Sequence, residues 1–176
     1  MNKWVADFLR DNILLVKAKS FEELYSMLER QERKELTEAF MAMGIDPLRY
    51  MTAIPKGYAS TTGVSNLRFA KNLECIGAKA FSNCSEIETL KIPDGCTLIG
   101  VMAFYGCYNL TTIYLPGTIE RICSRAFYCC DGLEEIYYNG TVEEWKETID
   151  VSECFPSSAI SVVTVHCKDG DILLQD

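Results

Sequence analysis

Residues 76–93 read IGAKAFSNCSEIETLKIP, and residues 99–116 repeat the pattern as IGVMAFYGCYNLTTIYLP. Equivalent positions lie 23 residues apart, and the repeat runs four times without an insertion. The same residue types return at fixed positions: Ile76, Ile99 and Ile122; Phe81, Phe104 and Phe127; Cys84, Cys107 and Cys130. A fixed period of about 20–50 residues is typical of chains in which each repeat stacks on the next. The sequence therefore predicts a solenoid, and its function depends on the surface that the solenoid presents.

Each repeat also contains one short strand of the form L-x-x-L-x-L, in which alternate side chains point into the core. The four strand segments are Val64-x-x-Leu67-x-Phe69, Ile87-x-x-Leu90-x-Ile92, Leu110-x-x-Ile113-x-Leu115 and Leu133-x-x-Ile136-x-Tyr138. This motif predicts a leucine-rich repeat solenoid of short parallel β-strands joined by turns or short helices. We expect an N-terminal α-helical cap and a small C-terminal cap to close its two ends.

The repeat resembles the BspA-like leucine-rich repeat, whose signature is Ile-Gly-x-x-Ala-Phe-x-x-Cys-x-x-Leu-x-x-Ile-x-Leu-Pro. It stands here at Ile76–Pro93, at Ile99–Pro116 and, with Cys123 in the glycine position, at Ile122–Asn139. The resemblance covers about residues 53–170. It implies a right-handed solenoid used for protein–protein contact or adhesion, without catalytic residues, usually on the surface of bacteria and some eukaryotic microbes. The asparagine ladder of the commoner repeat is missing, because Gly95, Thr118 and Thr141 occupy its positions.

The patterning divides the chain into three segments. Residues 1–52 carry helical periodicity and are expected to cap the first repeat or to form an independent interaction or dimerisation module. Residues 53–144 hold the four repeats. Residues 145–176 form the C-terminal cap. Near its start, residues 141–149 predict a short capped helix that lays Trp145 over the last repeat, and residues 160–167 predict a strand before a turn at Asp169-Gly170.

The outward positions of the predicted strands define a candidate partner-binding surface on the concave side. They form two columns: Asn66, Thr89, Thr112 and Glu135, and beside them Arg68, Lys91, Tyr114 and Tyr137. Tyrosine and arginine are enriched at binding hot spots, which makes the second column a candidate site for a protein partner. Tyrosine also suits exposed strand positions for stability alone, so the pattern leaves both interpretations open.

The sequence argues against an enzyme. It contains no G-x-x-x-x-G-K-[ST], G-x-S-x-G or H-E-x-x-H motif, and its single histidine, His166, leaves little room for a catalytic triad. No cofactor and no metal site are expected, since no C-x-x-C pair is present. The net charge is −8. Residues 141–176 hold eight acidic and two basic side chains, a balance of −6 that argues against nucleic acid or an anionic membrane as a partner.

The N-terminus does not predict a secretory signal, because Asp7, Arg10 and Asp11 interrupt it. No segment approaches the ~18 consecutive apolar residues of a membrane helix. We therefore expect a cytoplasmic protein, with cell-surface or virion association as alternatives. The nine cysteines are expected to be reduced thiols, mainly in the core, and disulfides between neighbouring repeats under oxidation are the alternative.

Two functions of different classes remain open. The first is a non-enzymatic protein–protein interaction module that binds through the concave strand face. The second is a structural or assembly component that forms a homo-oligomer, or joins a larger particle such as a phage virion, through its N-terminal helices. A minor third function is acidic inhibition of a nucleic-acid-handling protein. Four strands span only ~15–20 Å, so a tight interaction is expected to use the N-terminal helices as well.

Overall fold

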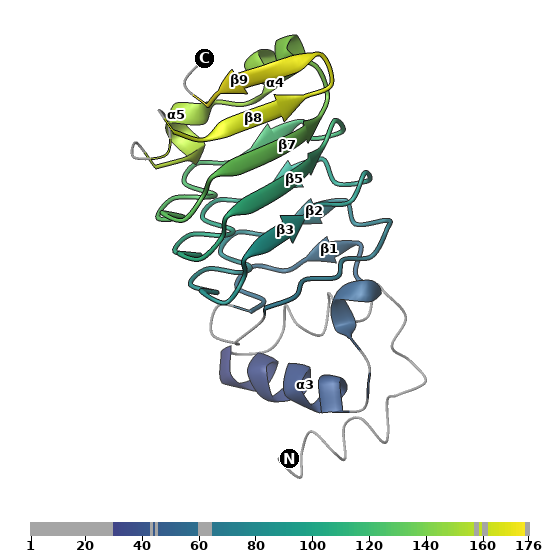
Figure 1. Cartoon of the computed structure of the whole chain (residues 1–176). Coiled ribbons are helices and arrows are strands. Elements are labelled where there is room, and N and C mark those ends of the chain that lie inside the picture. Colours follow the sequence, from purple (N-terminus) through teal and green to yellow (C-terminus); the bar gives the residue numbers. More distant parts are fainter. Residues whose placement is uncertain are drawn as a thin grey trace.

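The computed structural model describes residues 30–42, 44, 46–59, 65–156, 159 and 162–174, and the labels used below are those of Figure 1. Successive coils of the chain stack into a solenoid with a β-sheet on each of two sides (Figure 1). The first sheet has the order β1-β2-β4-β6, with all strands parallel. Its strands are β1 (Ala53–Ile54), β2 (Cys75–Ile76), β4 (Leu98–Ile99) and β6 (Arg121–Ile122).

The second sheet has the order β3-β5-β7-β8-β9 and carries the longer strands. Its members are β3 (Thr89–Lys91), β5 (Thr112–Pro116), β7 (Glu135–Asn139), β8 (Thr164–Cys167) and β9 (Gly170–Leu173). Strands β3, β5, β7 and β8 run parallel, and β9 returns antiparallel to β8. Leu90 pairs with Ile113, which pairs with Ile136, so the 23-residue register predicted from the sequence is confirmed for these three strands.

The first repeat departs from the predicted pattern. Residues 65–69 form no strand, and Val64 lies outside the described residues. Leu67 is nevertheless buried, and the Ala70 N–H donates to the carbonyl of Leu48, 2.9 Å away. This repeat therefore packs on the chain that follows the N-terminal helix instead of on a preceding strand, which is why the sheet begins one repeat later. The expectation of four repeat strands on this face is wrong for the first one, and β8 and β9 extend the sheet at the other end.

The core is built from columns of like residues stacked coil upon coil. The phenylalanine rings of Phe81, Phe104 and Phe127 are nearly parallel, with centroids 5.3 and 5.4 Å apart. Phe155 of the C-terminal cap continues the column at 5.2 Å, although it does not follow the 23-residue period. Tyr58 stands edge-on to Phe81 at the other end, in place of the missing phenylalanine of the first repeat. Offset ring pairs at these separations are favourable beyond their apolar burial.

A column of cysteines lies beside the rings and is bonded to the neighbouring coils. Each thiol donates to a main-chain carbonyl: Cys84 to Ala59, Cys107 to Phe81, Cys130 to Phe104 and Cys154 to Ile122, with sulfur–oxygen distances of 3.1–3.4 Å. All nine cysteines are free thiols in this structure. In this column, cysteine serves as a small buried side chain that also satisfies a backbone acceptor.

Both ends of the stack are covered. Helix α3 (Arg30–Ala42) buries Leu36 and Phe40, and Gly44 follows with φ +74°, a left-handed conformation that glycine adopts without strain. The short helix η1 (Pro47–Arg49) comes next. The helical periodicity predicted before residue 30 lies outside the described residues.

At the other end, α4 (Val142–Thr148) is the predicted short capped helix, and it begins with a capping box. The Thr141 hydroxyl accepts from the Glu144 N–H, and the Glu144 carboxylate accepts from the Thr141 N–H. Trp145 is 1% exposed and stands edge-on to Tyr138, as the sequence predicts. Helix α5 (Val151–Cys154) leads from there toward the β8–β9 hairpin.

Candidate functional site

The candidate surface is a row of side chains that crosses all five strands of the second sheet. The row consists of Lys91 on β3, Tyr114 on β5, Tyr137 on β7, His166 on β8 and Asp171 on β9. Each residue is the register partner of the next, so backbone pairing fixes their order. We call these five residues the aromatic row.

The rings of the aromatic row stack on one another. The Tyr114 and Tyr137 centroids are 4.8 Å apart with an interplanar angle of 11°, and those of Tyr137 and His166 are 4.7 Å apart at 20°. The Lys91 Nζ lies 4.9 Å from the Tyr114 ring centroid, a cation–π distance. Since parallel strands are spaced ~4.8 Å apart, the sheet itself imposes this stacking. The result is a rigid strip whose ring edges face outward.

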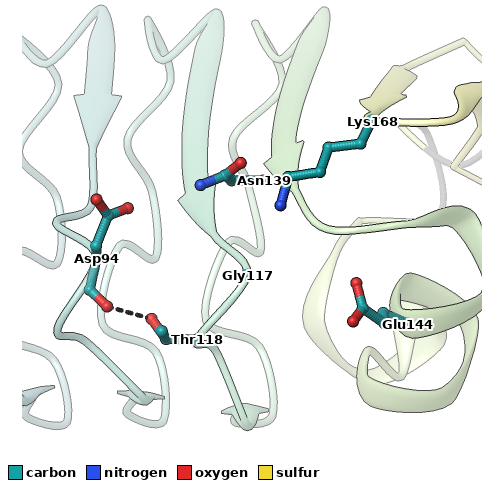
Figure 2. A pocket seen from close by; sticks show the side chains of 6 residues that line it. All are labelled: Asp94, Gly117, Thr118, Asn139, Glu144 and Lys168. Atoms are coloured by element: carbon teal, nitrogen blue, oxygen red, sulfur yellow. Dashed lines mark hydrogen bonds between the residues drawn. The ribbon is translucent and has the colours of Figure 1, made fainter.

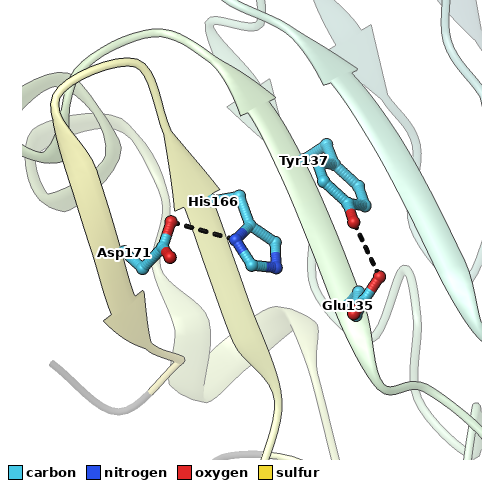
Figure 3. Close-up of polar contacts among 4 residues, drawn as sticks. All are labelled: Glu135, Tyr137, His166 and Asp171. Carbon is cyan, nitrogen blue, oxygen red and sulfur yellow. Dashed lines mark hydrogen bonds and ion pairs between the residues drawn. The ribbon is translucent and has the colours of Figure 1, made fainter.

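Hydrogen bonds fix two members of the row further (Figure 3). The Tyr137 hydroxyl donates to the Glu135 Oε2 at 2.8 Å, and the His166 Nδ1 donates to the Asp171 Oδ1 at 2.9 Å. The bond to the Glu135 carboxylate, with smaller contributions from burial and nearby charge, raises the pKa of the Tyr137 hydroxyl. The His166 Nε2 is buried and has no partner among the described residues. With Nδ1 held by Asp171, the imidazole is fixed in orientation beside Tyr137.

The other residues predicted for the surface have more varied positions. Thr89 is exposed, whereas Thr112 and Glu135 are half-buried; these three form the neighbouring column in register across β3, β5 and β7. Arg68 and Asn66 are exposed but lie on the irregular chain of the first repeat, not on a strand. The structure thus brings six of the eight predicted side chains into two in-register columns. Binding through them remains a prediction.

Sequence reasoning missed His166 and Asp171 as members of the surface. The alternation ending at Cys167 did predict a strand there, and Thr164–Cys167 is one. Its pairing with β7 was not foreseen, because the interval from Glu135 to its partner Thr164 is 29 residues instead of 23. Two helices occupy the intervening chain. The signal available in the sequence was a shared pattern: His166 follows Thr164 and Val165 as Tyr137 follows Glu135 and Ile136, an outward residue after an apolar one.

A polar pocket of about 260 Å³ opens beside this surface, where the parallel strands end (Figure 2). Its lining residues come from the turns after β3, β5 and β8, from the end of β7 and from α4: Asp94, Gly117, Thr118, Asn139, Glu144 and Lys168. The Thr118 hydroxyl lies within hydrogen-bonding distance of the Asp94 and Cys96 carbonyls of the preceding coil. Thr118 therefore links successive turns from the position at which the commoner repeat has asparagine.

Several buried thiols of the core have raised pKa values. Burial raises the pKa of the Cys84 and Cys154 thiols to about 12 and that of Cys96 to about 11. Hydrogen bonding with Cys107, together with burial, raises the pKa of Cys130. Such thiols stay protonated near neutral pH, and the thiolate is the reactive form.

Among the described residues, His, Cys, Asp and Glu side chains nowhere gather in threes that could hold a metal ion. Along the same part of the chain, no helix combines the length and apolar character needed to cross a bilayer.

The stacked coils, the 23-residue register and the ordered surface columns define a leucine-rich repeat solenoid. A family model described as the BspA type leucine rich repeat region (6 copies) matches residues 52–168. The chain belongs to this family. Repeat domains of this kind are typically protein-binding modules and are generally non-catalytic. A search of curated proteins finds no match.

Proposed function

We propose that this chain is a non-enzymatic protein-binding module that engages its partner through the face carrying the aromatic row. The observation that carries the proposal is the stacking of Lys91, Tyr114, Tyr137 and His166 at separations of 4.7–4.9 Å. Tyrosines held in one orientation lose little side-chain entropy on binding, and rigid aromatic side chains dominate many interface hot spots.

The dimensions of the face support a small binding site. Five strands at ~4.8 Å spacing span roughly 20 Å across the strands. A standard interface buries about 800 Å² on each partner, which is more than a strip of this width supplies alone. A tight complex should therefore also use a neighbouring surface. The N-terminal segment is the surface that we propose, with the cytoplasm as the compartment in which the complex forms.

The test is a pull-down from a lysate of the source cells with the tagged full-length chain and mass-spectrometric readout. The variant Tyr114→Ala/Tyr137→Ala removes the centre of the aromatic row. The matched control is Tyr105→Ala/Tyr128→Ala, which removes two half-buried tyrosines, also one repeat apart, that follow the core phenylalanines. We expect a specific partner that the wild-type protein and the control retain and that the first variant loses.

Two outcomes would contradict the proposal. One is a partner that binds the Tyr114→Ala/Tyr137→Ala variant as well as it binds the wild-type protein. The other is a stable oligomer in mass photometry that both variants preserve, with no partner captured. The second result would favour the assembly function, with the N-terminal segment as its site.

A further inference from the structure

The aromatic row is polarised in charge along the stacking direction. At one end stands Lys91 on β3, and the exposed Arg68 lies one repeat earlier in the sequence, on the irregular chain of the first repeat. At the other end stands the exposed Asp171, which belongs to the C-terminal segment 141–176 with its eight acidic and two basic side chains. Glu135 adds a second carboxylate to the acidic half. Lys168, which follows β8 at the margin of the sheet, is one of the two basic residues of that segment.

The middle of the aromatic row restricts what kind of ligand can bind. Lys91 covers one face of the Tyr114 ring and Tyr137 covers the other, and Tyr137 is itself enclosed between Tyr114 and His166. A sugar ring or a nucleobase would need a free aromatic face on which to stack, and neither tyrosine offers one. What both present are ring edges and polar groups. Among the described residues, no hydrogen bond engages the Tyr114 hydroxyl, and Tyr114 is 37% exposed.

The length of the row matches a short extended peptide. From Lys91 to Asp171 the row crosses four strand-to-strand steps of ~4.8 Å, or roughly 19 Å. An extended chain advances ~3.3 Å per residue, so about six residues cover this distance. Opposite charges on the peptide would meet Lys91 at one end and Asp171 and Glu135 at the other.

We infer that the aromatic row binds an extended peptide segment of about six residues whose acidic side chains are grouped at one end and whose basic side chains are grouped at the other. The segment lies across the strands, with its acidic end over Lys91 and its basic end over Asp171. This inference rests on the proposed function and specifies the partner's chemistry. Complementary charges set orientation and suppress wrong partners, which suits a face with two oppositely charged ends.

Fluorescence anisotropy with the full-length protein tests the inference directly. The probes are two labelled nine-residue peptides of identical composition, one with three glutamates, a Ser-Gly-Ser spacer and three lysines, the other with the charges alternating. We expect the segregated peptide to bind at least about tenfold more tightly at low ionic strength, and the difference to shrink as salt screens the charges. Equal affinity of the two peptides for the wild-type protein would overturn the inference.

Charge-reversal variants locate the site. Lys91→Glu should weaken the segregated peptide about tenfold, and Asp171→Lys should weaken it as well, because each variant makes one end of the row repel the peptide end that it meets. The control Lys79→Glu makes the same change in net charge at an exposed turn residue outside the second sheet. Circular dichroism must show each variant folded. Equal weakening by Lys79→Glu would mean that net charge, not the row, governs binding.

The same samples separate this inference from the proposed function and from self-association. Suppose that a partner needs Tyr114 and Tyr137 but binds Lys91→Glu as well as it binds the wild-type protein. This result would support the proposed function and overturn the inference of a charge-polarised peptide. Sedimentation of the protein alone tests whether a second copy of this chain occupies the row instead. A dimer that Tyr114→Ala dissociates would assign the row to a second copy of this chain and overturn the inference as well.

Discussion

The column of core rings predicts how stability is distributed along the solenoid. Phe104 is 0% exposed and lies between Phe81 and Phe127 at 5.3 and 5.4 Å, so it makes two ring pairs. Phe155 is equally buried at 1% exposed, and among the described residues it stacks on Phe127 alone. Replacement by leucine retains most of the apolar volume and removes the stacking. The two substitutions therefore differ chiefly in the number of ring pairs lost.

A stacked ring pair contributes about 0.5–1.5 kcal/mol beyond apolar burial. Phe104→Leu should therefore lower the free energy of unfolding by about 1–3 kcal/mol, and Phe155→Leu by about half as much. Phe104→Ala adds lost burial and a cavity, for a total of about 3–5 kcal/mol. Urea unfolding followed by far-ultraviolet circular dichroism measures the free energy of unfolding of all three variants. The comparison requires that this free energy falls with urea concentration at the same slope as in the wild-type protein.

The control is Tyr108→Leu, at a side chain that is 51% exposed, which should change the free energy of unfolding by no more than about 0.5 kcal/mol. The reasoning fails if Phe155→Leu costs as much as Phe104→Leu. It also fails if Phe104→Leu costs no more than the control, because the stacked column would then add nothing to ordinary apolar packing.

Three further predictions concern the caps, the close approach of neighbouring coils and the buried thiols. Thr141→Ala removes the capping-box hydroxyl of α4 and should lower the free energy of unfolding by about 1 kcal/mol in urea titration; no change would show that the bond to the Glu144 N–H contributes nothing to stability. Gly100→Ala should lower the free energy of unfolding by about 1–3 kcal/mol, since its Cβ would lie 2.7–2.8 Å from backbone atoms of Ile76, Gly77 and Ala78. Gly170→Ala, with open space around it, should lower it by less than about 1 kcal/mol. Equal melting temperatures of the two variants would contradict this prediction. Burial raises the pKa of the Cys84 thiol from 9.0 to about 12. The buried thiol form therefore stabilises the fold below pH 9, and that stability, on the order of 4 kcal/mol, is lost as the pH rises from 9 to 12. Cys84→Ala should lose less stability than the wild-type protein over this pH range, and identical pH profiles of the free energy of unfolding would refute the prediction.

The repeat could be predicted from the sequence because its signal is local and periodic. Leu90, Ile113 and Ile136 lie in register as the 23-residue interval requires, and the same interval places Lys91, Tyr114 and Tyr137 in one row. The short capped helix that begins after Thr141 was also predicted, and the structure shows that its cap is a box closed by Glu144, three residues away. Each of these features depends on chain neighbours or on a fixed interval.

The features that the sequence did not reveal depend on pairings without a period. Residues 65–69 form no strand, and the neighbouring Ala70 bonds to Leu48 of η1, a contact that no repeat interval indicates. The entry of Phe155 into the ring column and of His166 into the aromatic row depends on how α4 and α5 fold between β7 and β8. Only the three-dimensional path of that connection decides which residue lies beside Tyr137.

The contrast between the inner and outer sides of the sheet explains where recognition can reside. Inward positions of the sheet repeat almost unchanged, as in Leu90, Ile113 and Ile136, because each must fill the same space between coils. Outward positions in the same register differ from strand to strand and pass from lysine through tyrosine and histidine to aspartate. The tight packing of the core does not constrain these residues, whereas the sheet holds them at fixed spacing and in fixed order. A stack of nearly identical coils thus presents a row with two chemically different ends, and the cap that closes the solenoid supplies the acidic one.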